Sequence, residues 1–67
     1  MTTTLSYTEI EKLISEWILS ERDRKIMRRK LLDGIPIERI SEEVDMSPRQ
    51  VHRIVKKNTA KLQERGF

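Results

Sequence analysis

The fold of this chain is decided by residues 36–57, which read PIERISEEVDMSPRQVHRIVKK. In the first half of this segment aliphatic residues recur at three- and four-residue intervals, namely Ile37, Ile40 and Val44. The second half shows a similar pattern with Val51, Ile54 and Val55. Such intervals place apolar side chains on one face of an α-helix. We therefore predict two helices, one over about Pro36–Val44 and one that begins at Pro48.

The second of these helices has a strong start signal. Ser47 precedes Pro48, which fits a first helical turn, and Ser47-x-x-Gln50 has the spacing of a capping box. Asp45 and Met46 form the connection, and we expect Met46 to plug the turn. Helices joined by so short a turn cross steeply, as in a helix-turn-helix. The segment 36–57 therefore predicts this motif.

Upstream of the motif, a helix is predicted over about Tyr7–Leu19. Ser6 and Thr8 are both candidate N-caps, and Ser6 has Glu9 at capping-box spacing. The apolar stripe of this helix consists of Ile10, Leu13, Ile14, Trp17 and Ile18. We expect Trp17 to lie in the core. The alternative is a dimer contact, because a domain of this size buries little apolar surface.

Another helix is predicted from the cap Ser20 to about Leu32. The acidic side chains in its first turn suit the helix macrodipole. Its apolar side consists of Ile26, Met27 and Leu31, and we interpret Arg28-Arg29-Lys30 as a ridge that faces solvent or phosphate. Gly34 is expected in the left-handed conformation after the helix, with Pro36 in the first turn of the next one.

Together these elements predict an all-α, four-helix domain, in which an N-terminal helix packs on a three-helix core. We expect residues 1–67 to form one domain, with disorder over 1–5. The chain has no cysteine and one histidine, so we expect neither a disulfide nor a metal site. We find no apolar run long enough to span a bilayer and no signal peptide. We therefore expect a cytoplasmic protein without membrane contact.

The sequence shows no sign of a catalytic site. An enzyme needs acid, base or nucleophilic groups that converge in a pocket. The clustered carboxylates instead lie on a predicted solvated helix beside basic residues, and they are Glu38, Glu42 and Glu43. We therefore predict that the chain is not an enzyme and that it needs no cofactor.

Positive charge is concentrated towards the C-terminal end. The formal net charge is +3, from 14 basic and 11 acidic side chains. Residues 1–20 contain three acidic and one basic side chain, whereas residues 46–67 contain six basic and one acidic side chain. This distribution indicates a polyanionic partner. On charge alone, a solvated lysine-rich helix is the alternative.

One side of the helix after Ser47 combines the residue types that read DNA. At about 100° per residue, Arg49, His52, Arg53 and Lys56 lie within about 100° of one another, opposite the apolar positions. We predict that Arg49 and Arg53 read bases, because arginine donates two hydrogen bonds to guanine. Gln50 could read adenine, although capping competes for its amide. His52 and Lys56 complete the predicted base-reading set, with simple solvent exposure as the alternative for His52.

Phosphate contacts are predicted around this side of the helix, from Ser47, Arg39, Lys57 and Lys61. Such contacts set affinity and register but not sequence preference. Free N–H groups at the start of the helix can also hold a phosphate. We therefore predict double-stranded DNA as the partner, with this helix in the major groove.

From Ser20 to about Leu62 the chain resembles region 4 of the sigma-70 family, and more loosely the helix-turn-helix of resolvases and LuxR-type regulators. The matching stretches are ERDRKIM at 21–27, LDGIPIERIS at 32–41 and MSPRQV at 46–51, continuing to Lys56. Three positions depart from the family pattern. Ser41 replaces the usual alanine where the helices approach closely, Asp45 replaces the usual glycine and must accept a strained or left-handed backbone, and Arg29 replaces an apolar residue.

The resemblance implies promoter-type DNA contact by residues 47–57. We expect a small stand-alone transcription regulator of phage or mobile-element origin in a bacterial cell, because the promoter-melting and polymerase-binding regions of a complete sigma factor are absent. The alternative is a protein-interaction module that mimics region 4 and binds RNA polymerase or another protein through the first helix, with Trp17 and Tyr7. A homodimer with Trp17 or Phe67 at the contact is a further expectation.

Overall fold

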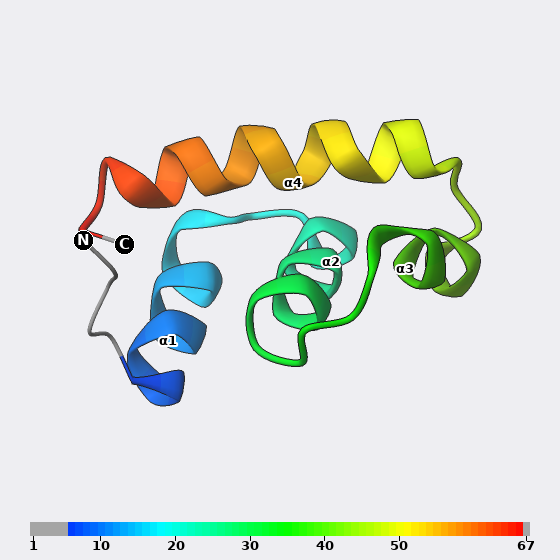
Figure 1. Cartoon of the computed structure of the whole chain (residues 1–67). Helices are drawn as coiled ribbons and strands as arrows, with labels where there is room; N and C mark the ends of the chain where they lie inside the picture. Colours follow the sequence, from blue (N-terminus) through cyan, green and yellow to red (C-terminus); the bar gives the residue numbers. More distant parts are fainter. Residues whose placement is uncertain (1–5, 67) are drawn as a thin grey trace.

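The computed structural model describes residues 6–66, so the expected disorder of residues 1–5 and the dimer role of Phe67 fall outside it. Over these residues the chain forms α1 (Tyr7–Trp17), α2 (Glu21–Leu31), α3 (Ile37–Val44) and α4 (Pro48–Gln63). Figure 1 shows that α4 lies across α1, α2 and α3, and it contacts all three. The predicted all-α, four-helix fold with a helix-turn-helix is confirmed for the described residues. None of these helices has the length and apolar character needed to cross a membrane.

Three of the four helices begin at a serine that caps the first turn. The hydroxyl of each serine accepts a hydrogen bond from the backbone N–H three residues further on, at 3.2–3.3 Å, at Ser6, Ser20 and Ser47. The Ser6 cap is a complete capping box, because its own N–H donates to the Glu9 carboxylate. This bond is the main reason why the pKa of Glu9 lies below its usual value. The predicted serine caps are confirmed, and Thr8 lies inside α1.

The turn between α3 and α4 has the left-handed geometry that the sequence required. Asp45 has φ 57° and ψ 48°, and its N–H donates to the carbonyl of Ser41. Aspartate tolerates this conformation better than most residues other than glycine. Met46 packs against the core beneath the turn, as predicted. Ser41 is buried, and its hydroxyl donates to the Glu38 carbonyl at 2.6 Å, so no polar group is stranded there.

Three helix boundaries differ from the predictions, and one of them is the end of the second helix, at Leu31 and not at Leu32. The first helix ends at Trp17 and not at Leu19, because Ile18 adopts an extended conformation with φ −109°. The third helix begins at Ile37, and Pro36 is its N-cap with ψ 152°, just outside the first turn. Gly34 has φ 68°, so its predicted left-handed conformation is confirmed.

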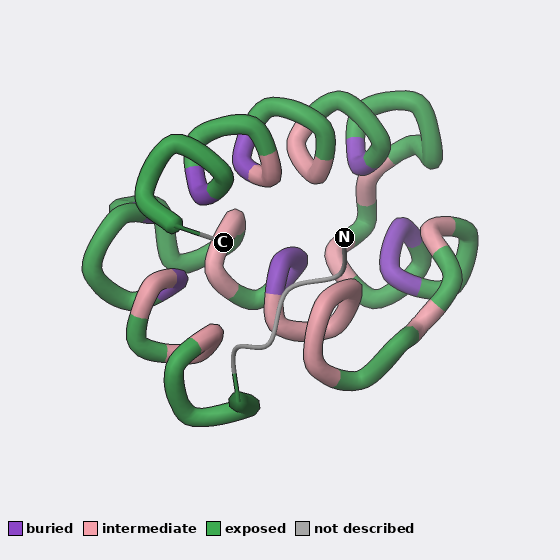
Figure 2. The backbone as a smooth tube through the Cα atoms, turned by 60° about the vertical axis from the view of Figure 1, so that its left-hand side comes forward, coloured by how far each residue is buried: buried purple, intermediate pink, exposed green. Residues whose placement is uncertain are grey.

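The core consists of two clusters that share α2 and α4. One cluster lies between α1, α2 and α4, and its buried members are Ile14, Ile18, Met27 and Leu62. The other lies between α2, α3 and α4, with Ile26, Ile40 and Val51. Val51 and Leu62 are about three turns apart on one side of α4, so the helix is held along most of its length. Figure 2 shows the buried positions of α4 on the side towards the other helices.

The predicted core position of Trp17 is wrong. Its side chain lies at the end of α1 and is 37% exposed, whereas the following Ile18 is buried. The guanidinium of Arg65 lies 4.1 Å from the centre of the indole ring, at cation–π distance. At the last turn of α1 the apolar stripe no longer faces the core, so Trp17 is not buried. Arg65, which follows α4, lies over the indole ring.

Candidate nucleic-acid interface

α4 presents opposite sides to the core and to solvent. Its buried residues are Val51, Asn58 and Leu62. Its exposed residues include Arg49, His52, Arg53 and Lys56, which we call the cationic face. At 100° per residue these four lie within about 100° of one another, and at 1.5 Å per residue the face extends for about 10 Å along the axis. The structure therefore brings together four of the five predicted base-reading residues.

The cationic face is not neutralised by the rest of the fold. In residues 6–66 every salt bridge involves an arginine of α2, and none involves the cationic face. The helix that carries the face is anchored, because the opposite side of α4 packs into both core clusters. A fixed, unpaired positive surface attracts polyanions without the cost of first breaking internal ion pairs.

Gln50, the fifth predicted base reader, is engaged in the cap of α4. Its Oε1 accepts from the Ser47 N–H at 3.1 Å, while the Ser47 hydroxyl accepts from the Gln50 N–H at 3.2 Å. The competition that the sequence suggested therefore exists, and it ties the Gln50 carbonyl oxygen to the backbone. Ser47 is exposed, but its hydroxyl works first as the helix cap.

The predicted phosphate contacts are spread over two helices. Lys57 and Lys61 are exposed on one flank of α4, next to the cationic face. Arg39 is exposed on α3. It lies near Glu43, whose pKa is lowered mainly by a hydrogen bond from Arg29 and to a smaller extent by the charge of Arg39. Arg39 therefore lies near both acidic and basic side chains, and Lys57 and Lys61 form no salt bridge within residues 6–66.

Arg29 links α2 to α3, the first helix of the helix-turn-helix. Its Nε donates to Glu43 Oε1 at 2.9 Å, and its Nη1 donates to Asp33 Oδ2 at 3.0 Å. These bonds raise the pKa of Arg29 above its usual value and lower the pKa of Glu43. A guanidinium suits this role because its planar fork can serve two carboxylates.

The interpretation of Arg28-Arg29-Lys30 as a solvent- or phosphate-facing ridge holds only in part for the two arginines, whose side chains are 39% and 32% exposed but are paired with other residues of the fold. Arg28 reaches back to α1, where its Nη2 donates to the Ser15 hydroxyl at 3.3 Å and its Nε lies 3.7 Å from Glu11. Arg24, on the same helix, donates from its Nη2 to the Ser15 carbonyl at 3.1 Å. These contacts bind α1 to α2, and among residues 28–30 it is Lys30 that forms no salt bridge within the described part of the chain.

Asn58 is a structural residue that the sequence analysis missed. It is buried on the core side of α4, and its Nδ2 donates to the Ile54 carbonyl at 3.0 Å and to Asp23 Oδ2 at 3.5 Å. The second contact fastens α4 to the start of α2. A signal was present, because Asn58 continues the three- and four-residue spacing of Val51, Ile54 and Leu62.

A groove runs beside the cationic face, between α2, α3 and α4. It has a volume of about 630 Å³, and we call it the side groove. Its lining residues are Lys30, Ile37, His52, Val55, Lys56, Thr59, Ala60 and Gln63. His52 and Lys56 thus belong both to this groove and to the cationic face. Among the other lining residues, Lys30 was expected to face solvent or phosphate as part of residues 28–30, and the rest were not predicted as site residues.

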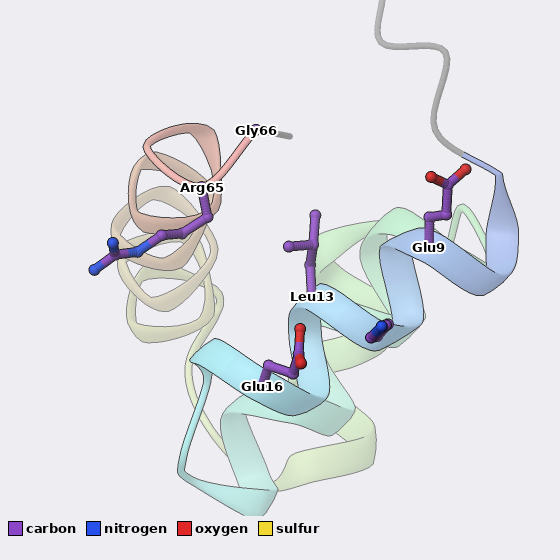
Figure 3. Close-up of a pocket in the computed structure, with 6 residues that line it drawn as sticks. Glu9, Leu13, Glu16, Arg65 and Gly66 are labelled. Carbon is purple, nitrogen blue, oxygen red and sulfur yellow. The ribbon is translucent and has the colours of Figure 1, made fainter.

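A second hollow, of about 300 Å³, lies between α1 and the end of α4. Figure 3 shows Leu13 pointing into the space between these two segments, with Glu9 and Glu16 along α1 and Arg65 on the opposite side. Lys12 completes the charged lining. Because carboxylates and cations alternate around it, this hollow does not have the uniform charge that suits a nucleic acid.

Comparisons of this chain with protein-family models, with curated proteins and with solved structures found no match. Among residues 6–66, no three histidine or carboxylate side chains are grouped so as to hold a metal ion. The candidate interface therefore depends on the geometry and charge described above.

Proposed function

We propose that this protein binds double-stranded DNA with sequence preference and regulates transcription, with α4 lying in the major groove. The observation that carries the proposal is the cationic face, which is exposed and forms no salt bridge within residues 6–66. The opposite side of the same helix is anchored in the core. A helix of this kind can enter a groove about 12 Å wide without losing its support.

The proposed roles follow from side-chain chemistry. Arg49 and Arg53 read guanine through paired hydrogen bonds, and each good pair contributes about 1–3 kcal/mol of discrimination. His52 and Lys56 extend the contact along the groove. Gln50 contacts a base through its amide nitrogen, because its amide oxygen is engaged in the helix cap. Phosphates are contacted by a separate set, namely Ser47, Arg39, Lys57 and Lys61. Such a regulator would act in the cytoplasm or nucleoid of a bacterial or phage-infected cell.

A salt titration tests this proposal. Gel-shift affinities for duplex DNA should fall steeply between 50 and 200 mM salt, with a log–log slope of about −3 or steeper if the three basic phosphate contacts form. The variant Lys61→Ala should weaken binding to all duplexes about equally and make the slope shallower by about one. A native protein that shifts no duplex even at low salt would overturn the proposal.

A second candidate function rests on a different surface. The exposed large apolar side chains are Tyr7 at 59%, Trp17 at 37% and Leu19 at 79%, all on or just after the acidic α1. Tyr7 lies at the start of α1, and Trp17 and Leu19 lie at or just after its end. Exposed apolar side chains of this kind can contact a protein, either RNA polymerase or a second copy of this chain. Capture of purified polymerase by the native protein but not by Trp17→Ala, with no duplex shifted, would favour this function.

A homodimer is compatible with the first proposal. Many helix-turn-helix proteins bind two half-sites about one DNA turn apart as two-fold dimers. Light scattering on the free and DNA-bound protein would measure the state directly. The Trp17→Ala variant should lower the bound mass from two chains to one if the indole lies at the contact.

A further inference from the structure

The side groove adjoins the cationic face, with which it shares His52 and Lys56, and its other lining residues extend beyond that face. Three helices contribute to it: Lys30 comes from the end of α2, Ile37 begins α3, and the remainder lies on α4. None of its lining residues is acidic. The hollow beside α1, in contrast, is lined by Glu9 and Glu16 as well as by two basic residues.

The lining combines an apolar floor with basic and polar edges. Ile37 and Val55 are half-buried and pack against the core cluster of α3 and α4. Lys30, His52 and Lys56 supply the basic side chains, and Thr59 and Gln63 add a hydroxyl and an amide. The apolar floor can contact deoxyribose rings, and the basic and polar edges can bind phosphates. This pairing matches the alternation of deoxyribose and phosphate along a DNA strand.

Lys30 stands apart from its neighbours in the chain. Arg28 and Arg29 both lie within salt-bridge distance of carboxylates, whereas Lys30 forms no salt bridge within residues 6–66. It is half-buried and lines the groove. The fold thus neutralises two of three consecutive basic residues and leaves the one that borders the groove.

We propose that the side groove seats the sugar–phosphate backbone of one DNA strand, with Lys30 as a phosphate contact from outside the helix-turn-helix. This inference rests on the proposed function. A helix in the major groove has a phosphate strand along each side, and His52 and Lys56 connect the base-facing side of α4 to this groove. The first helix of a helix-turn-helix also crosses the backbone, and Ile37 at its start lines the groove.

The variant Lys30→Ala tests the inference, with Lys12→Ala on α1 as the matched control. Removing one phosphate contact makes the log–log salt slope shallower by about 0.9, so the affinity ratio of native to variant should shrink about 3.5-fold between 50 and 200 mM salt. The preferred sequence should not change. Lys12→Ala should leave both slope and affinity as in the native protein.

A second measurement locates the contact on the DNA. Duplexes with a single uncharged methylphosphonate, moved stepwise along each strand, should weaken native binding at positions on both strands. With Lys30→Ala, the sensitivity should vanish at one or two positions on one strand only. Lys30→Gln, which keeps part of the aliphatic stem, should behave in the same way. Circular dichroism and thermal unfolding show whether each variant is folded.

The failures of the two proposals are distinguishable. A native protein that binds no duplex overturns the proposed function. If the native protein binds, but the two folded Lys30 variants keep the native salt slope and phosphate pattern, only the side-groove inference is overturned. Binding of an acidic peptide that Lys30→Ala abolishes, with an unchanged DNA slope, would also overturn it and assign the groove to a protein partner.

Discussion

α2 and α4 both carry arginine on their outer sides, yet the two helices use it in opposite ways. On α2, the guanidiniums of Arg24, Arg28 and Arg29 are turned onto α1, Asp33 and Glu43. On α4, Arg49 and Arg53 remain exposed and form no salt bridge within residues 6–66. A basic helix therefore indicates a polyanionic partner only where the fold leaves its charges unpaired.

The largest expected effect is a loss of stability when the core cluster that α2 and α4 share with α3 is disrupted. Ile40 is fully buried between α2, α3 and α4. Ile40→Ala should destabilise the domain by about 2–5 kcal/mol, through lost burial and a residual cavity. A 67-residue domain has a total stability of only about 3–10 kcal/mol, so this variant should be largely unfolded or close to it.

Urea unfolding monitored by circular dichroism measures this effect, and Ile40→Val serves as the matched control. The smaller deletion should cost about 0.5–1.5 kcal/mol and leave DNA binding intact once the protein is folded. Equal midpoints for the native protein and Ile40→Ala would show that α3 is not held as described.

An intermediate effect separates the paired arginines from the open ones. Arg29→Ala leaves Glu43 and Asp33 without their shared partner, so the melting temperature should fall while the preferred DNA sequence stays the same. Arg29→Lys keeps the charge but cannot bond two carboxylates through a planar fork, so it should restore only part of the loss. Differential scanning calorimetry measures the melting temperatures, which should fall from the native protein to Arg29→Lys and further to Arg29→Ala. A changed DNA preference in Arg29→Ala with an unchanged melting temperature would reverse the roles assigned to the two helices.

The smallest effect is a pH dependence of the same contact. Glu43 has a lowered pKa in the folded chain, mainly because Arg29 donates hydrogen bonds to it. A lowered folded pKa contributes stability that is present above the unfolded pKa, about 4.3, and is lost as pH falls through the folded value. The melting-temperature gap between the native protein and Glu43→Gln should therefore be constant near neutral pH and narrow below about pH 4. A gap that widens on acidification would contradict the pairing.

Most of the fold could be predicted because its signals are local. The serine caps, the left-handed Asp45 and the apolar spacing each depend on residues within one or two turns. The pairing of Arg29 with Glu43 could not be predicted, because the two residues are 14 positions apart and come together only when α2 and α3 pack. The prediction that Trp17 lies in the core was wrong for a similar reason. The apolar stripe of α1 does not show by itself where the helix extends beyond the core.

In the candidate site, too, features that depend on local sequence could be predicted, and features that depend on helix packing could not. The cationic face was predictable, because helical periodicity alone places Arg49, His52, Arg53 and Lys56 together. The side groove was not, because it forms only where Lys30 and Ile37 from two other helices come beside α4. The engagement of Gln50 in the cap was anticipated from spacing, and the structure supplies the bonds.

The most direct test of the account is selection of bound duplexes from a random pool, carried out in parallel with native protein, Arg53→Ala and Arg29→Ala. The native protein should enrich a defined sequence, and Arg53→Ala should lose preference at one or two positions while the rest is retained. Arg29→Ala, assayed at a temperature where it is folded, should enrich the native sequence unchanged. A native pool that stays random, or an Arg53→Ala pool identical to the native one, would contradict the claim that the open side of α4 reads DNA.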